Sequence, residues 1–175
     1  WIDRQSVAEG DRDAIHAWGR RAPFLVVTGA TARTTYTPEA PAVSEVQLEM
    51  GQRVPLLPDW PASAAVNGQL PAAHHVVELP VRDADGRLAF APALLPRSAD
   101  VARDYLPLTA ANLLRQAFKF LGERYGWGHS YNARDCSGFA SEIYRSFGVL
   151  IPRNTSAQAV SPALNRLPFD AGDSH

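Results

Sequence analysis

The first half of the chain carries its hydrophobic residues in short runs that are typical of β-strands. These runs lie at 24–31, 44–51, 53–57, 74–81 and 87–95. Turn-forming pairs separate them, and Asp85-Gly86, between two extended runs, is the strongest hairpin signal in the chain. Short strands joined by tight turns predict a small β-barrel. The segment from Val7 to Trp18 that precedes them fits either a short helix or the tail of another module.

The hydrophobic period changes from strand-like to helical after Asp104. Thr109 can cap a helix that is predicted to end near Gly122. The apolar residues of this helix form a single stripe at positions 113, 114, 117, 118 and 121. A loop rich in glycine, asparagine and aromatic residues follows.

Two further helices are predicted after that loop. The first begins beside Cys136 and ends at Gly148, and its apolar residues Phe139, Ile143 and Phe147 recur every four positions. The second is short, and Thr155 with Gln158 has the spacing of a capping box at its start. Together with the strand-like runs, these patterns predict an α+β protein.

Composition and charge narrow the classes of partner. The chain is 46% apolar and 20% charged, with a formal net charge of -1 and a pI near 6.6, which indicates a globular protein. Such a charge balance gives no attraction to polyanions, so no nucleic-acid partner is expected. No apolar run approaches the roughly 20 residues needed to cross a bilayer, so no membrane span is predicted.

Cys136 is the single cysteine. A single cysteine cannot form an intramolecular disulfide. No Cys/His cluster has the spacing of a zinc site, so no metal is expected. The sequence also lacks a glycine-rich phosphate loop and a dinucleotide fingerprint, and no cofactor is therefore expected.

Cys136 has two interpretations. A lone cysteine is by default a small buried hydrophobe without reactivity. However, Asp135 near the cap places Cys136 in the first turn of its helix, where unpaired N–H groups and the helix dipole favour a thiolate. Ser137 and Gly138 are small and allow a substrate backbone to approach closely. This arrangement favours a nucleophile.

The segment "YGWGHSYNARDCSGFASEIYRSFGVLIPRNTSAQA" resembles the N-terminal half of the NlpC/P60 cysteine peptidases, which are similar to papain. The resemblance covers about residues 108–160 and rests on an aromatic-Trp-Gly segment, the Asp-Cys-Ser-Gly-Phe sequence and a following Pro-Arg-polar segment. The β-rich region resembles bacterial SH3-like domains that precede this catalytic domain in γ-D-glutamyl-L-diamino acid endopeptidases. The implied organisation is an upstream tail or linker at 1–20, an SH3-like β-barrel at 21–100 and the N-terminal helical part of a papain-like domain at 104–175.

The resemblance implies a role for each matching residue. Cys136 would be the nucleophile, Tyr125 would help to polarise the scissile carbonyl, Asp135 would receive the free amine of an L-Ala-γ-D-Glu substrate, and Ser137 would line the same pocket. The remaining predicted substrate-binding residues are Trp127, Arg153, Asn154 and Thr155. The family usually has a second glycine where this chain has His129.

Cysteine attack also requires a general base. In this family the base is a histidine on a strand further along, whereas His175 lies in a polar context without strand character. The base is therefore expected beyond residue 175, with His129 or His175 as the alternative. On this interpretation the chain is one piece of a larger protein, and the stripe through Phe139, Ile143 and Phe147 would be exposed to the rest of the polypeptide.

These features predict a cysteine endopeptidase that hydrolyses γ-D-glutamyl-diamino acid bonds in peptidoglycan stem peptides. The alternatives are a non-catalytic wall-binding protein with a degenerate peptidase domain and an acyltransferase on the same fold. Wall chemistry favours the periplasm or cell envelope, while recycling of wall peptides would place the protein in the cytoplasm.

Overall fold

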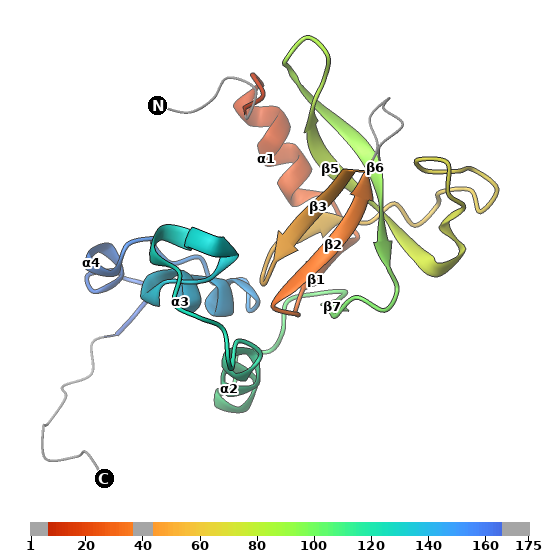
Figure 1. The fold of residues 1–175 in the computed structure, drawn as a ribbon. Helices are drawn as coiled ribbons and strands as arrows, with labels where there is room; N and C mark the ends of the chain where they lie inside the picture. The colour runs from red at the N-terminus through yellow and green to blue at the C-terminus, as the bar shows by residue number, and fades with distance from the viewer. Residues whose placement is uncertain (1–6, 37–43, 166–175) are drawn as a thin grey trace, which may run out of the picture.

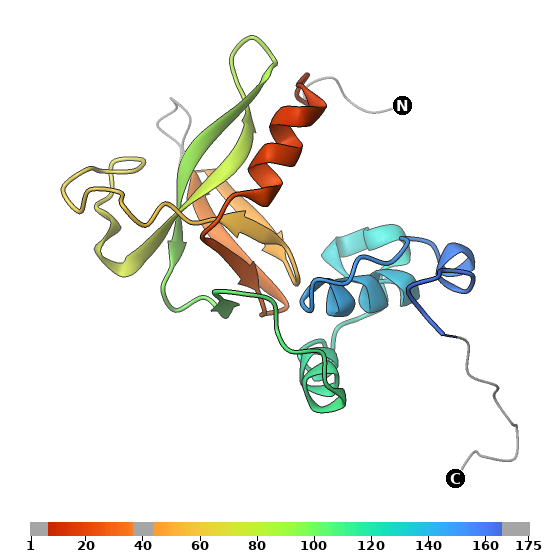
Figure 2. The same cartoon turned by 180° about the vertical axis from the view of Figure 1, so that it is seen from behind.

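The computed structural model describes residues 7–36 and 44–165, which divide into a β-rich region and a helical region (Figure 1). The strands are β1 (Phe24–Val27), β2 (Thr31–Tyr36), β3 (Ser44–Glu49), β4 (Arg53–Pro55), β5 (His74–Arg82), β6 (Leu88–Pro96) and β7 (Val101–Ala102). The helices are α1 (Arg12–Arg20), α2 (Ala110–Phe118), α3 (Cys136–Arg145) and α4 (Thr155–Gln158), with short 3-10 segments η2 (Pro71–Ala73) and η3 (Trp127–Asn132). Figures 1 and 2 show α2, α3 and α4 grouped on one side of the strands.

The strands form two antiparallel sheets instead of a closed barrel. One sheet has the order β4-β1-β7 and the other has the order β3-β2-β6-β5. An isolated bridge between Leu56 and Val77 links them. The strands β4 and β7 have three and two residues. The fold is mixed α and β as predicted, but the SH3-like barrel is not confirmed among the described strands.

The predicted hairpin at Asp85-Gly86 is confirmed. The strands β5 and β6 pair in register from His74 opposite Pro96 to Arg82 opposite Leu88. Gly86 has φ +85°, a value that a residue without Cβ adopts at little cost, and this allows the tight turn.

An aliphatic core lies between the strands. Its buried members are Leu25, Val27, Ala32, Leu48, Val54, Leu56, Val77, Leu79, Ala93 and Leu95. Full burial of one Val or Leu side chain contributes about 1.5–3 kcal/mol. The β-rich region is therefore held together by apolar packing.

The segment before the strands is a helix, which resolves the alternative left open by the sequence. The Asp11 carboxylate caps α1 by accepting a hydrogen bond from the amide of Asp13. Trp18 stacks on Phe90 with ring centroids 6.2 Å apart, and its indole donates to the carbonyl oxygen of Glu78. Thus α1 packs on the β5–β6 hairpin.

The helix α2 begins where the sequence predicts and ends earlier. Thr109 caps it by accepting from the amide of Asn112 at 3.2 Å. The helix ends at Phe118, before Gly122, because the amides of Phe120 and Leu121 bond three residues back and tighten the chain. None of the described helices is long and apolar enough to cross a bilayer.

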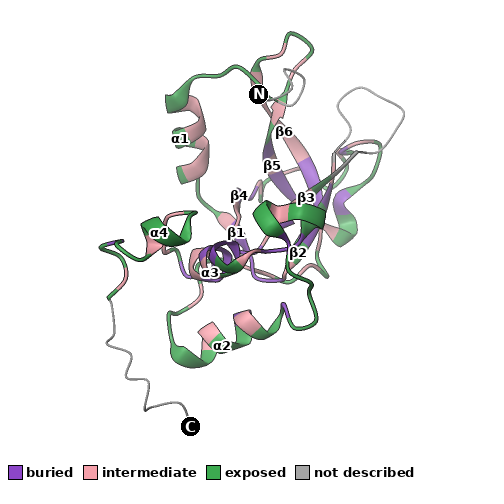
Figure 3. Ribbon diagram, turned by 60° about the vertical axis from the view of Figure 1, so that its left-hand side comes forward, coloured by how far each residue is buried: buried purple, intermediate pink, exposed green. Residues whose placement is uncertain are grey.

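The stripe on α3 is mostly buried, contrary to the prediction that it would be exposed. Ile143 and Phe147 are buried against Met50 and Phe120, and only Phe139, at 37% exposure, remains open. The β-rich region supplies Met50, so it covers the face that the prediction assigned to missing strands. Figure 3 shows the buried residues of α3 beside the strands, while α2 and α4 are largely exposed.

Polar contacts also fix the helical region on the strands. Gln116 and Lys119 both donate to the main-chain oxygen of Thr28, at 3.0 and 2.8 Å. The amide side chains of Gln47 and Asn132 exchange two hydrogen bonds of 2.9 Å. The segment that precedes Cys136 is therefore tied to β3.

Candidate active site

Cys136 is the first residue of α3, and its side chain is exposed. The Asp135 carboxylate caps the helix by accepting from the amide of Gly138 at 2.8 Å. Asp135 has an extended backbone (φ -87°, ψ 178°), so the chain turns into the helix at the cysteine. The predicted position of the thiol in the first helical turn is confirmed.

Hydrogen bonds activate the thiol. Hydrogen bonding with Thr155, whose hydroxyl oxygen lies 3.4 Å from Sγ, is the largest effect that lowers the pKa of Cys136 below its ordinary value. The Tyr125 hydroxyl and the main-chain amide of Ser137 act in the same direction, whereas desolvation and the charge of Asp135 oppose them. Desolvation and the contact with Cys136 raise the pKa of Tyr125, so its hydroxyl keeps its proton.

Asp135 connects the helix start to the segment after α3. Its carboxylate accepts a hydrogen bond from Arg153 at 2.8 Å, and this contact is the main reason that the pKa of Asp135 lies well below its usual range. Arg153 also donates to the Ser137 hydroxyl at 2.8 Å. The amide of Gly128 donates to the same carboxylate at 3.2 Å. The predicted role of Asp135 in receiving a substrate amine stays a prediction, and such an amine would compete with Arg153.

The helix α4 places Thr155 beside the thiol. Asn154 occupies the cap position, and its side chain makes no capping bond, so the predicted capping box is wrong. Thr155 is instead the first helical residue and points to Cys136. Gln158 donates to the main-chain oxygens of Ser137 and Pro152 at 3.0 and 2.7 Å. The two residues of the predicted box thus attach α4 to the start of α3.

All eight residues predicted from the sequence to form the site line one cavity of about 450 Å³. These residues are Tyr125, Trp127, Asp135, Cys136, Ser137, Arg153, Asn154 and Thr155. Their convergence is a finding of the structure, and their individual roles stay predictions.

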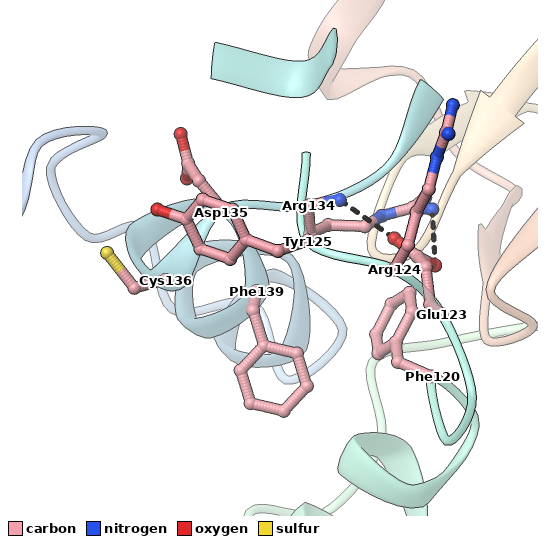
Figure 4. Close-up of a pocket in the computed structure, with 8 residues that line it drawn as sticks. All are labelled: Phe120, Glu123, Arg124, Tyr125, Arg134, Asp135, Cys136 and Phe139. Carbon is pink, nitrogen blue, oxygen red and sulfur yellow. Dashed lines mark hydrogen bonds and ion pairs between the residues drawn. The ribbon is translucent and has the colours of Figure 1, made fainter. Parts of the chain in front are cut away.

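A second cavity of about 310 Å³ shares Tyr125, Asp135 and Cys136 with the first. Figure 4 shows its lining residues, with the Cys136 sulfur and the Tyr125 hydroxyl toward one end and the ion pair of Arg134 with Glu123 toward the other. Five of these residues are not predicted from the sequence as cavity wall: Phe120, Glu123, Arg124, Arg134 and Phe139. Phe120, Glu123 and Arg124 lie well before the cysteine motif, where no pattern singles them out.

The turn before the cysteine is tightly built. A Cβ on Gly126 would lie 2.5 Å from the carbonyl oxygens of Ser130 and Ala133, so only glycine fits there. Trp127 follows and is 79% exposed at the cavity rim. His129 has φ +63°, where the family usually has glycine. Its Nε2 faces Gly138, 3.2 Å from the position that a Cβ would take.

The general base is not identified among the described residues. His129 is not a hydrogen-bond partner of Cys136, whose side chain interacts with the hydroxyls of Thr155 and Tyr125. His175 lies outside the described residues. His74 and His75 line a separate cavity at the far end of the β5–β6 hairpin, and His16 is exposed on α1.

A buried ion pair beneath the site was not predicted. Arg134 donates to Glu142 at 2.9 Å and to Glu123 at 3.0 Å, and it also reaches the main-chain oxygen of Ala30. The side chain of Arg134 is 5% exposed and that of Glu142 is fully buried. Their spacing of eight residues gave no signal, because Arg134 lies before the cap of the helix that carries Glu142 and not on the helix itself.

Several known proteins are similar to this chain in sequence and in fold. The chain is 31% identical over 141 residues to the γ-D-glutamyl-L-lysine dipeptidyl-peptidase of Bacillus cereus, a match that covers 78% of this chain and 37% of that protein. An NlpC/P60 family protein from Bacillus cereus aligns with TM-score 0.59 and 26% identity, over 90% of this chain and 46% of that one.

An NlpC/P60 endopeptidase from Photobacterium damselae subsp. piscicida has a similar fold, with TM-score 0.64 and 22% identity over 91% of this chain and 30% of that one. The chain thus spans less than half the length of each of these three proteins. Residues 122–173 match the NlpC/P60 family itself. This matched segment contains Cys136, its capping Asp135 and the companion Thr155.

Proposed function

We propose that the protein is a cell-wall cysteine peptidase in which Cys136 attacks a γ-D-glutamyl amide of a peptidoglycan stem peptide. The observation that carries the proposal is an exposed thiol at the start of α3, open to two cavities and hydrogen-bonded so that its pKa is lowered. The name of the Bacillus cereus relative supports the γ-D-glutamyl bond as the target.

The proposed reaction has two steps. Sγ of Cys136 bonds to the carbonyl carbon, and the resulting oxyanion receives hydrogen bonds from the first-turn N–H groups of α3 and from Tyr125. The C–N bond then breaks, and the amine leaves with a proton. Water hydrolyses the thioester, which releases the glutamyl carboxylate and restores the thiol. We propose that the histidine that carries these protons lies outside the described residues.

The β-rich region has a supporting role in this proposal. It covers α3 through Met50 and holds the segment before Cys136 through Gln47. We propose that it is an SH3-like module that shapes the substrate cleft. The substrate also sets the proposed location, which is the periplasm or cell envelope, with wall-peptide recycling in the cytoplasm as the alternative.

The test is turnover of L-Ala-γ-D-Glu-diaminopimelate by the protein in the longest form that its gene encodes. The expected products are L-Ala-γ-D-Glu and free diaminopimelate. Cys136→Ala should lower the turnover rate by about 10⁴-fold or more without lowering the melting temperature. The control is Ser156→Ala, an exposed neighbour of Thr155.

Each other outcome would overturn the proposal in a distinct way. Binding of the peptide without product formation would indicate a non-catalytic wall-binding protein. Transfer of the dipeptide to an added amine in preference to water would indicate an acyltransferase. Turnover that survives Cys136→Ala would exclude the thiol as the nucleophile.

A further inference from the structure

Three metal-ligating side chains converge beneath the site, and the proposed reaction uses none of them. Glu49 ends β3, His129 lies in η3 and Glu142 lies on α3. Each offers one ligand atom, and the three atoms all lie within 4.8 Å of one another. The cluster therefore joins three elements, of which β3 is far in sequence from the other two.

Glu142 has a buried oxygen that points to a missing partner. The side chain is fully buried, and its Oε2 accepts a hydrogen bond from Arg134. Oε1 is also buried and has no hydrogen-bond partner among the described residues. The carboxylate of Glu49 and the imidazole of His129 likewise have no hydrogen-bond or ion-pair partner there. Buried polar atoms are nearly always hydrogen-bonded or bound to an ion, so a ligand for Glu142 Oε1 is the simplest explanation of this acceptor.

The charges around Glu142 favour a divalent cation. The carboxylates of Glu49, Glu123 and Glu142 surround the single guanidinium of Arg134, which is paired with two of them (Figure 4 shows its pair with Glu123). The formal sum over these four groups is about -2 when all three carboxylates are ionised. Desolvation raises the pKa of Glu142 to about 7, so Arg134 compensates the cost of burying its charge only in part. A divalent cation between Glu49 and Glu142 would neutralise this charge in a site where desolvation makes unpaired charge costly.

We propose that Glu49, His129 and Glu142 bind a divalent transition-metal ion of the zinc class. One imidazole nitrogen with two carboxylate oxygens suits zinc, whereas calcium and magnesium prefer oxygen ligands alone. Ligands about 2 Å from a tetrahedral metal lie about 3.3 Å apart, so the present separations require only a small inward movement. The bound metal would link β3 and the turn that carries Trp127 to α3.

The test is zinc titration by calorimetry on the protein with Cys136→Ser, which removes the thiol as a competing ligand. One equivalent should bind and raise the melting temperature, and Co²⁺ should give tetrahedral absorption bands. His129→Gly should weaken binding by at least about a hundredfold. This substitution also removes a side chain at positive φ, so it should not unfold the protein. Glu49→Gln should have the same effect on binding.

The matched control is His16→Ala, which removes an exposed histidine from α1 and should leave zinc affinity unchanged. Zinc binding that is unaffected by both His129→Gly and Glu49→Gln would overturn the proposal. So would binding that disappears with Cys136→Ser alone, because the thiol would then be the ligand. Weakening by His16→Ala equal to that by His129→Gly would indicate adventitious surface binding and would also overturn it.

Discussion

The β-rich region and the helical region bury different kinds of side chain. The core between the strands is aliphatic, and Leu25, Val77 and Leu95 are at most 1% exposed. The helical region has a smaller apolar core and also buries charged groups, among them Arg134 and Glu142. Buried ionic groups must be positioned by specific partners, whereas aliphatic side chains need only shape and volume. The first region therefore acts as a scaffold, and the second fixes one particular arrangement next to the cysteine.

The largest effect is expected when the buried ion pair of Arg134 and Glu142 is broken. Arg134→Ala leaves Glu142 buried without its cation, and it should lower the free energy of unfolding by about 4 kcal/mol. Urea denaturation followed by circular dichroism, with a chelator present, measures the loss. Arg124→Ala is the control, because Arg124 is exposed and, among the described residues, makes no hydrogen bond or ion pair, its ring contact being with Tyr131, 3.8 Å from the centroid. It should cost about 1 kcal/mol or less.

The double variant Arg134→Met, Glu142→Leu tests whether stability depends on the two charges themselves or only on filling the same space. Replacing both partners by apolar groups should recover most of the stability that the single variant loses. If Arg134→Ala costs no more than Arg124→Ala, the charges are not a structural core, and the difference between the two regions disappears.

The aliphatic core gives the next largest effect. Leu95→Ala removes a side chain with no exposed surface, and we expect a loss of about 3 kcal/mol in the free energy of unfolding. Leu121→Ala is the control, because Leu121 is 82% exposed, and it should change stability by less than about 0.5 kcal/mol. Under native conditions the alkylation rate of Cys136 should not change in either variant. A changed alkylation rate in Leu95→Ala would contradict the role of the β-rich region as a passive scaffold.

The sequence pattern anticipated the features that arise from neighbouring residues. The short strand-like runs located β1, β3, β4, β5 and β6, and Asp135 as a cap placed Cys136 at the helix start. The strand β2 was missed because "TARTTY" is rich in threonine, whose β-branched side chain favours strands without adding a hydrophobic signal. Hydrophobic periodicity is therefore a partial guide to strands with a polar face.

Features that join distant segments left no trace in the pattern. In the cluster of Glu49, His129 and Glu142, Glu49 lies 80 positions before His129, whereas metal-binding motifs that are recognisable in a sequence have short spacings. The cap of α4 was assigned to Thr155 from local spacing, but its hydroxyl faces Cys136 across 19 positions of sequence. In both cases a tertiary contact decides what the side chain does.

The smallest predicted effect is on the reactivity of the Cys136 thiol. This thiol belongs to the helical region and not to the β-rich scaffold. Thr155→Val keeps the shape of the side chain and removes the hydroxyl that contacts Sγ. Because that contact lowers the pKa of Cys136, its loss should raise the pKa toward the ordinary value. Less thiolate is then present at neutral pH, and the iodoacetamide rate at pH 7 should fall on the order of a few fold. At a pH above both pKa values the two rates should converge. Thr155→Ser retains the hydroxyl and should follow the parent profile, whereas a Thr155→Val profile that superimposes on the parent would show that the hydroxyl does not stabilise the thiolate.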